Sequence, residues 1–128
     1  MEIGTQKLLW TGSELMGADA SIVLSENISN QLNGIVLLFA RYNGSYVFYE
    51  AFNSFFVSKA VVDLTDSYSN PYHNFMMALD LDVSAMACKR LNIYGNRIEG
   101  HENNTKSGTH CGITYNNNNY VLVGVIGV

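Results

Sequence analysis

Val121-Leu122-Val123-Gly124-Val125-Ile126-Gly127-Val128 is an apolar octet rich in β-branched side chains, and it follows the tract Tyr115-Asn116-Asn117-Asn118-Asn119-Tyr120. β-branched residues favour strands, and asparagines favour turns. Terminal residues fray in water unless other parts of the fold hold them in place. The octet therefore predicts an all-β module whose last strand is buried, either in the chain's own sheet or against another subunit.

Composition indicates one folded domain over residues 1–128. Hydrophobic residues make up 48% of the chain and charged residues only 14%, which is not typical of disorder. The net charge is −4 and the seven lysines and arginines are scattered, so we expect no binding to nucleic acid. The longest apolar stretches reach about eight residues, too few for a membrane span. No basic segment followed by an apolar one marks a signal peptide, so we expect synthesis in the cytoplasm.

A hairpin signal lies in the first half of the chain. Asn43-Gly44 separates two β-rich segments, residues 35–42 and 45–50. Asn-Gly between such segments favours a type I′ turn, in which both central residues have positive φ. The first segment is apolar at both odd and even positions, which point to opposite faces of a strand. This predicts a central strand covered on both faces. Residues 52–62 are expected to continue as a strand, bent near Asn53-Ser54.

The remaining pattern predicts short strands separated by turn signals. Residues 27–33 are expected to form a loop, with one helical turn as the alternative. Eight to ten antiparallel strands, with under about a tenth of the residues helical, indicate a single β-sandwich or jelly-roll-like domain. The other expected strands are 6–12, 20–26, 75–82, 90–94 and 97–101, followed by a last hairpin of 110–115 and 120–128.

One long polar loop is expected at residues 63–74, and it holds the only proline. Loops on a rigid scaffold often carry binding residues. Tyr68, Tyr72 and His73 are therefore the candidate contact residues.

No catalytic residue is predicted. Asp80 and Asp82 share one strand face, as the paired acids of some glycosidases do, but paired acids on a solvent face are far more common. Thr109, His110 and Cys111 are sequence neighbours, and neighbours on a strand point to opposite faces. We therefore expect a protein that is not an enzyme.

No metal or cofactor is predicted either. His73, His101 and His110 lack the spacing of metal ligands, both among themselves and with the two cysteines. Cys88 and Cys111 are expected to be free, buried thiols in strands, with a disulfide as the alternative.

Aromatic residues leave two interpretations open. Trp10, the only tryptophan, is expected in the core, with a sugar-stacking platform as the alternative. Tyrosines also flank two expected turns, where they could pack across strands or contact a sugar or a partner. These tyrosines are Tyr42, Tyr46, Tyr49, Tyr115 and Tyr120.

Several segments, in order along the chain, form a recognisable pattern: Leu9-Trp10-Thr11-Gly12 with Met16, Ile22 to Ser29, Asn33 to Ala40 with Tyr42, Phe55 to Lys59, Lys89 to Tyr94, Ile98 to His101, and Asn119 to Gly127. This pattern resembles small structural proteins and C-terminal domains of tailed bacteriophages that infect Gram-positive bacteria. The chain departs from it at Phe39, at Ser58, where the pattern has proline, at Val123-Gly124, where it often has a basic residue, and over residues 63–86, which match nothing in it.

The resemblance implies a virion-associated β-sandwich, similar to receptor-binding "shoulder" domains, at the tail tip, the baseplate or a fibre. It implies other phage structural proteins as partners, favours a homotrimer, and suggests contact with host cell-surface carbohydrate. The alternative function is a carbohydrate-binding adhesin module. A cell-wall-degrading enzyme is a poorer alternative, because no plausible catalytic pair is present.

Overall fold

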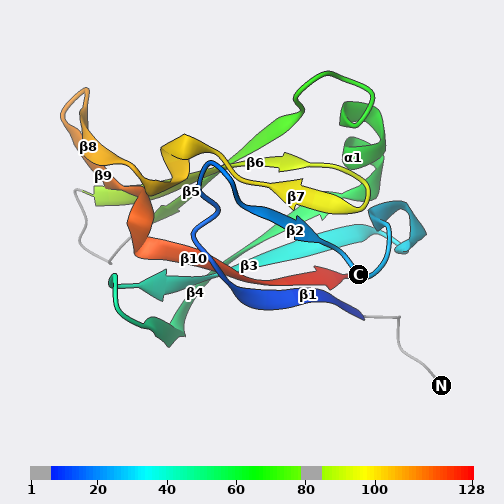
Figure 1. Ribbon diagram of the computed structural model, residues 1–128, viewed down its shortest axis with the longest axis horizontal. Coiled ribbons are helices and arrows are strands. Elements are labelled where there is room, and N and C mark those ends of the chain that lie inside the picture. The colour runs from blue at the N-terminus through cyan, green and yellow to red at the C-terminus, as the bar shows by residue number, and fades with distance from the viewer. Residues whose placement is uncertain (1–6, 79–84) are drawn as a thin grey trace.

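The computed structural model describes residues 7–78 and 85–128, and it forms two β-sheets packed face to face (Figure 1). One sheet has four strands and the other has six. The short helix α1 lies at one end of the sandwich, and the β8–β9 hairpin projects at the other end. The prediction of a predominantly β, sandwich-like single domain is therefore confirmed.

The four-stranded sheet has the order β1-β10-β3-β4, and every pair in it is antiparallel. Its central strands are therefore β10 and β3, which confirms the expectation that residues 35–42 form a central strand. The strands are β1 (Lys7–Glu14), β10 (Tyr120–Gly127), β3 (Gly34–Tyr42) and β4 (Val47–Ser58).

The six-stranded sheet has the order β2-β7-β6-β9-β8, and β5 also pairs with β6. The pairing of β6 with β9 is parallel, through Ala85↔Thr114 and Met86↔Tyr115, whereas only antiparallel strands were expected. Its strands are β2 (Ser21–Val23), β5 (Tyr72–Ala78), β6 (Ala85–Ile93), β7 (Arg97–Glu99), β8 (Ser107–His110) and β9 (Ile113–Asn116).

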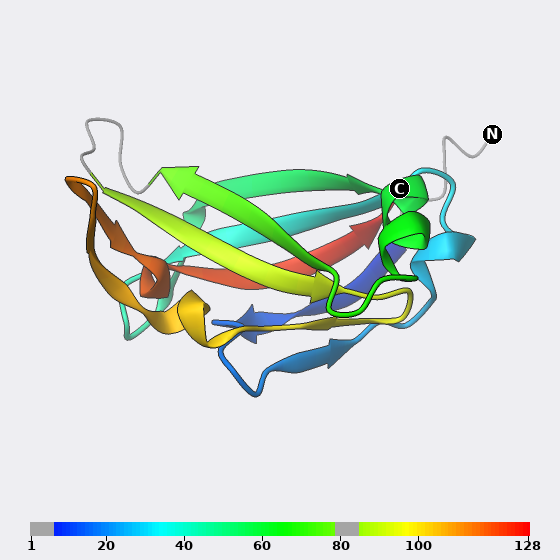
Figure 2. The same ribbon diagram turned by 90° about the horizontal axis from the view of Figure 1, so that it is seen from above.

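A single main core fills the space between the two sheets. In the view from above, β5 and β6 of the six-stranded sheet cross over β3 and β10 of the four-stranded sheet (Figure 2). Three aromatic rings join the layers: Phe39 of β3, Phe55 of β4 and Phe75 of β5, with centroids 5.1 to 6.2 Å apart. Tyr120 is also buried, and its hydroxyl donates a hydrogen bond to the Ala78 carbonyl oxygen (3.1 Å). Aromatic pairs at such distances add to the stabilisation that burial provides.

Strand β10 is buried over nearly its whole length, which confirms the expectation for the apolar octet. Its register against β3 shifts between Leu122 and Gly124, because two residues of β10 advance against one of β3. Such a β-bulge inserts one extra residue, so that beyond it the odd-numbered rather than the even-numbered side chains of β10 point into the main core. Val121 and Val123 consequently pack in a second cluster with Ala40, whereas Leu122 and Val125 both join the main core.

The Asn43-Gly44 hairpin forms, but its turn is not type I′. The last paired residues are Tyr42 and Val47, so the loop has four residues. Asn43 Oδ1 accepts hydrogen bonds from the backbone N–H groups of Ser45 (2.8 Å) and Tyr46 (2.9 Å). Only Gly44 of the two central residues has a positive φ, +95°. The side-chain bonds of Asn43 thus stabilise a wider loop than the dipeptide predicts.

The expected last hairpin is replaced by a different one. Strands β8 and β9 pair from Ser107↔Asn116 to His110↔Ile113, which leaves Cys111-Gly112 as a two-residue turn. Both turn residues have positive φ, +51° and +78°, as a type I′ turn requires. A 3-10 turn, η3 (Asn117–Asn119), then leads into β10.

The expected strand over residues 52–62 ends at Ser58 and is followed by helix α1 (Lys59–Thr65). Ser58 is the N-cap, and its Oγ accepts a hydrogen bond from the backbone N–H of Ala60 (3.1 Å). Val62 is buried in the core, so tertiary packing outweighs the strand propensity of its β-branched side chain. The expected bend near Asn53-Ser54 is absent, and the register shift of β4 lies instead between Phe48 and Phe52.

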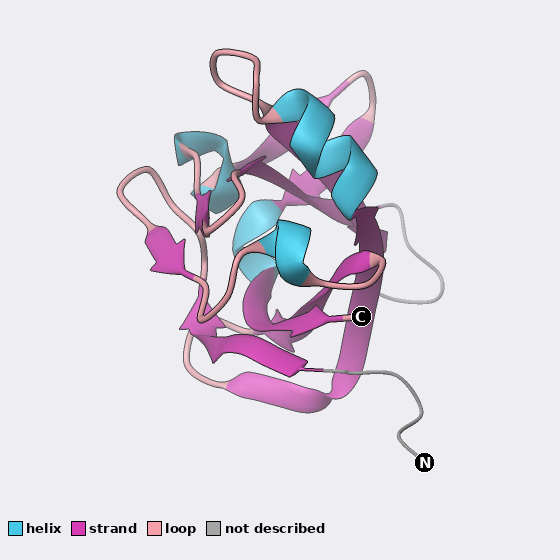
Figure 3. Ribbon diagram, turned by 90° about the vertical axis from the view of Figure 1, so that its right-hand side faces the viewer, coloured by secondary structure: helices cyan, strands magenta, loops and turns pink. Residues whose placement is uncertain are grey.

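Two further 3-10 turns are η1 (Ile28–Asn30), where a helical turn was the alternative to a loop, and η2 (Glu102–Thr105). Helix α1 and η1 lie at the end of the sandwich that faces the viewer in Figure 3, and each contributes a buried side chain to the core, Val62 and Ile28. With these elements the helical share is 15%, above the predicted tenth. The expected loop at 63–74 is also shorter, because α1 covers its first residues and β5 begins at Tyr72.

Candidate functional site

Two buried asparagines replace a missing strand beside β6. Along one edge β6 pairs with β9 only at residues 85–86 and with β7 only at residues 92–93. Between them, the Arg90 N–H donates to Asn104 Oδ1 (2.6 Å), and Asn104 Nδ2 donates to the Arg90 carbonyl oxygen (2.7 Å). The Cys88 N–H donates to Asn117 Oδ1 (2.8 Å). The side-chain amides thus supply the hydrogen bonds that a neighbouring strand would supply.

Lys89 lies between these asparagines, and its side chain is buried. Its Nζ donates hydrogen bonds to three backbone carbonyl oxygens, those of Leu15 (2.9 Å), Asn104 (2.9 Å) and Asn117 (2.6 Å). An ammonium has three N–H donors, so all three are satisfied. Lys89 therefore joins β6 to the segment after β1 and to the turns η2 and η3.

Burial lowers the pKa of Lys89 from 10.5 to about 7. The three carbonyl oxygens act in the opposite direction, because they favour the charged ammonium. Lys89 is only 1% exposed, so the cost of removing the charge from water is the larger effect.

A pocket of about 440 Å³ lies beside this network. Strands β5 and β6 contribute Asn74, Met86, Cys88, Lys89 and Arg90 to its lining. The region of η2 contributes Asn103, Asn104 and Lys106. The β8–β9 hairpin and η3 contribute Thr109, His110, Ile113, Tyr115 and Asn117. This volume is within the range of about 300–1,000 Å³ that small-molecule sites occupy.

The pocket carries positive charge on a chain whose net charge is −4. Two cationic side chains that reach solvent line it, the partly exposed Arg90 and the exposed Lys106, whereas Lys89 is buried and has a lowered pKa of about 7. Among the described residues that line it, none is an aspartate or glutamate. Glu102, which does not line the pocket, has its carboxylate 3.8 Å from Lys106 Nζ at the surface. The charge of the lining favours an anionic ligand.

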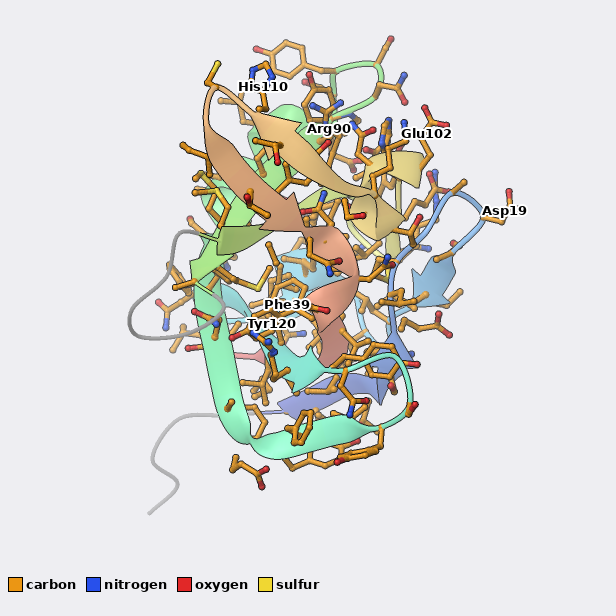
Figure 4. All side chains as sticks on the ribbon, turned by 90° about the vertical axis from the view of Figure 1, so that its left-hand side faces the viewer. Asp19, Phe39, Arg90, Glu102, His110 and Tyr120 are labelled. Carbon is orange, nitrogen blue, oxygen red and sulfur yellow. The ribbon has the colours of Figure 1, made fainter. Side chains whose placement is uncertain are left out.

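Arg90 is held in place by two residues of β5. Its Nε donates a hydrogen bond to Asn74 Oδ1 (3.4 Å), and its guanidinium carbon lies 4.2 Å from the centre of the Tyr72 ring. In Figure 4 the β8–β9 hairpin runs beside Arg90, with His110 near the tip of the hairpin and Glu102 on the other side of Arg90. The arginine is thus fixed at its Nε edge, so the other N–H groups remain as donors.

The three predicted contact residues do not form one surface. Tyr68 follows α1 and is 61% exposed. Tyr72 lies on the outer face of β5 under Arg90 and adjoins the pocket. His73 lies on the inner face, where its Nε2 is 3.4 Å from Thr65 Oγ1 and burial lowers the pKa of its imidazole. Their role in binding stays a prediction.

The cysteines are free, as expected, but only Cys88 is partly buried. Cys111 is exposed rather than buried in a strand, because it lies in the two-residue turn that joins β8 to β9. Burial raises the pKa of the Cys88 thiol, which disfavours the thiolate that nucleophilic chemistry would need.

The other candidate groups for chemistry are dispersed. In the described part of the chain, no group of three or more His, Cys, Asp or Glu residues is arranged to hold a metal ion. His101 caps η2 by accepting the Asn103 N–H at Nδ1 (3.1 Å). Asp80 and Asp82 lie outside the described residues.

Sequence reasoning missed the pocket, because its central residues looked like turn formers. Asn104 and Asn117 each belong to Asn-rich segments that favour loops, and nothing local marks them as buried. Lys89 occupies the same face of β6 as the apolar residues Ala87, Leu91 and Ile93, and this inward position is the one signal that could have identified it.

Some aromatic residues pack inside the fold, and others are exposed where they can contact a sugar or a partner. Trp10 packs at the edge of the main core, which favours the structural one. Tyr46 and Tyr49 are exposed by 59% and 62% near the β3–β4 loop, and Tyr115 lines the pocket.

In comparisons with known proteins, no family model and no curated sequence matches the chain. Within residues 7–78 and 85–128, no helix has the length and apolar character needed to cross a membrane.

Proposed function

We propose that the protein is a non-enzymatic structural component of a tailed-bacteriophage virion, at the tail tip, the baseplate or a fibre, that contributes to host attachment. One observation carries the proposal. Four of the segments that resemble phage proteins lie wholly or mostly on one strand each of the four-stranded sheet: Leu9–Gly12 on β1, Asn33–Ala40 on β3 except for Asn33, Phe55–Lys59 on β4 except for Lys59, and Asn119–Gly127 on β10 except for Asn119. Segments that are separate in sequence therefore form one structural unit, as expected for a resemblance that reflects a shared fold.

The pocket supports recognition as the function. Its polar groups are a guanidinium, an ammonium, amides and hydroxyls, which bind ligands by hydrogen bonds and charge. The Cys88 thiol beside them is kept protonated by burial.

The alternative function, a carbohydrate-binding adhesin module outside a virion, is favoured by the same pocket. Tyr115 offers a ring on which a sugar could stack, and Asn74 and Asn103 offer amides for its hydroxyl groups. The two functions differ in where the protein is found rather than in what it binds.

We also propose that copies of the chain associate, with a homotrimer as the favoured assembly. An apolar row crosses the outer face of the four-stranded sheet through the register pairs Leu8↔Ile126, Ile126↔Val36 and Val36↔Phe56. Leu8 and Phe56 are 60% and 58% exposed. A contiguous apolar face of this kind favours burial against another subunit. Light scattering on the purified protein should give three times the monomer mass for the parent and a lower mass for Phe56→Lys.

The virion assignment is tested by purifying particles of the phage that encodes the chain. Mass spectrometry should find the protein in gradient-purified virions, and gold-labelled antibodies should mark the tail end of the particle. A phage enzyme made only inside the host serves as the negative control. A protein absent from washed virions, or present no more than that enzyme, would contradict the assignment and favour the adhesin.

A further inference from the structure

The charge of the pocket selects one class of ligand. Arg90 and Lys106 bring positive charge to its lining, and among its described lining residues no carboxylate balances them. Glu102 meets Lys106 only at the surface, at 3.8 Å, and both side chains are more than half exposed. Such an exposed pair contributes little, so it leaves Lys106 able to bind another anion.

Arg90 presents the specific contact. Asn74 and Tyr72 fix the guanidinium from the β5 side through the Nε hydrogen bond and the ring contact. The Nη groups carry four further N–H donors in a planar fork, which matches the two oxygens of a carboxylate or a phosphate. A residue held in this way loses less side-chain entropy when it binds.

Other lining residues suit the uncharged part of a ligand. Tyr115 and Ile113, two residues apart on β9, contribute a ring and an aliphatic side chain. Asn103 and Thr109 add an amide and a hydroxyl. An aromatic ring next to amides and hydroxyls favours a sugar, which has an apolar ring face and hydroxyl groups at its edge.

We infer that this pocket binds an acidic saccharide, with its carboxylate or phosphate on Arg90 and Lys106 and its sugar ring against Tyr115. The inference rests on the proposed attachment function, since it names the chemistry that the attachment site recognises.

The test is a titration of the isotope-labelled protein followed by amide NMR shifts. The probes are glucose, glucuronic acid, glucose 6-phosphate and inorganic phosphate. The two charged sugars should bind about tenfold or more tightly than glucose, because charged hydrogen bonds contribute more than neutral ones. The shifts should centre on Arg90, Lys106 and Tyr115. The stronger of the two charged sugars identifies the acidic group.

Arg90→Gln and Lys106→Gln should each weaken binding of the charged sugars and leave that of glucose unchanged. Arg97→Gln is the matched control, because Arg97 also lies over a tyrosine ring, 3.9 Å from that of Tyr94, but outside the pocket. Its affinity for every probe should equal that of the parent. The amide spectrum of each variant reports whether it is folded.

Three results would overturn the inference: no shift with any charged sugar, equal affinity for glucose and glucose 6-phosphate, or parental affinity in Arg90→Gln. Equal affinity for inorganic phosphate and glucose 6-phosphate would show that the pocket does not recognise the sugar. A thymidine oligonucleotide that binds more tightly than the charged sugars would also contradict a saccharide ligand. Attachment is measured separately on whole cells. A protein that binds cells but no charged sugar contradicts this inference alone, and one that binds the sugars but no cells contradicts the attachment function alone.

Discussion

The Nζ of Lys89 donates a 2.6 Å hydrogen bond to the backbone carbonyl oxygen of Asn117, 28 positions along the chain. With the bonds to Leu15 and Asn104, it joins three connecting segments to the middle of β6. Two of these segments, η2 and η3, contribute residues to the pocket, so the buried lysine positions part of the binding surface although all three of its donors are used inside the protein.

Replacing Lys89 with methionine should destabilise the fold. Methionine keeps most of the side-chain volume but leaves three carbonyl oxygens without their donor, and each buried unsatisfied group costs about 1–3 kcal/mol. We expect the free energy of unfolding to fall by about 2–5 kcal/mol in urea denaturation, less than the sum of the three costs, because the variant no longer buries an ammonium group. Lys106→Met, at an exposed position, is the control and should stay within about 0.5 kcal/mol of the parent. A Lys89→Met protein as stable as that control would show that the network is dispensable.

The stability that involves Lys89 should depend on pH. Its pKa is about 7 when folded and 10.5 ordinarily, so between these values the unfolded chain binds more protons than the folded one. The free energy of unfolding therefore rises with pH across this window, by at most about 1.4 kcal/mol per pH unit. Urea denaturation at pH 7, 8 and 9 should show the parent gaining stability relative to Lys89→Met. A difference that is constant or shrinks with pH would contradict the lowered pKa.

Gly44→Val should destabilise the β3–β4 loop by about 1–3 kcal/mol, because a β-branched residue does not tolerate positive φ. A Cβ at Gly44 would meet no atom within 4 Å, so the effect reports backbone conformation alone. Gly124→Ala is the comparison, since a Cβ there makes an ordinary 3.8 Å contact with Leu38 and no positive φ is involved. Thermal unfolding should show a loss for Gly44→Val and almost none for Gly124→Ala; equal losses would mean that the loop is wrongly described.

Removing residues 121–128 should leave the chain unfolded or insoluble. Each buried Val or Leu side chain contributes about 1.5–3 kcal/mol, and several together approach the roughly 5–15 kcal/mol by which a domain is stable. Val123→Asp should act in the same direction on a smaller scale, because Val123 is 6% exposed. Val23→Asp is the matched control, at a strand position that is 71% exposed. Soluble expression and circular dichroism measure both. A folded, soluble truncation would show that β10 is dispensable.

The strands whose own residues clearly favour a strand were predicted correctly from the sequence. The predictions that were wrong have physical causes. β3 and β10 are long apolar segments, so their own composition is enough to predict that they are buried strands. Helix α1 was missed because Val61 and Val62 favour strands locally, whereas the Ser58 cap and the burial of Val62 decide the outcome. The type I′ turn was expected at Asn43-Gly44, but Asn43 bonds to the backbone of the loop, and the turn with two positive φ angles lies at Cys111-Gly112.

The candidate site was largely beyond prediction. Arg90, Lys106 and Tyr115 are far apart in sequence, and only the pairing of β6 with β9 and the position of η2 bring them to one pocket. Tyr72 was predicted as a contact residue for its place in an exposed loop, yet it lies on strand β5, where it supports Arg90. Periodicity identifies which face of a strand is buried, but it does not indicate which distant residues lie across from it.

The most direct test of the proposed attachment function is competition for adsorption. Host cells are incubated with purified protein before the phage that encodes the chain is added, and free phage are counted after a fixed time. Saturating parent protein and Arg97→Gln should both reduce adsorption, whereas Arg90→Gln should reduce it much less. Adsorption that is unchanged by saturating, folded parent protein would contradict a role for this chain in host attachment.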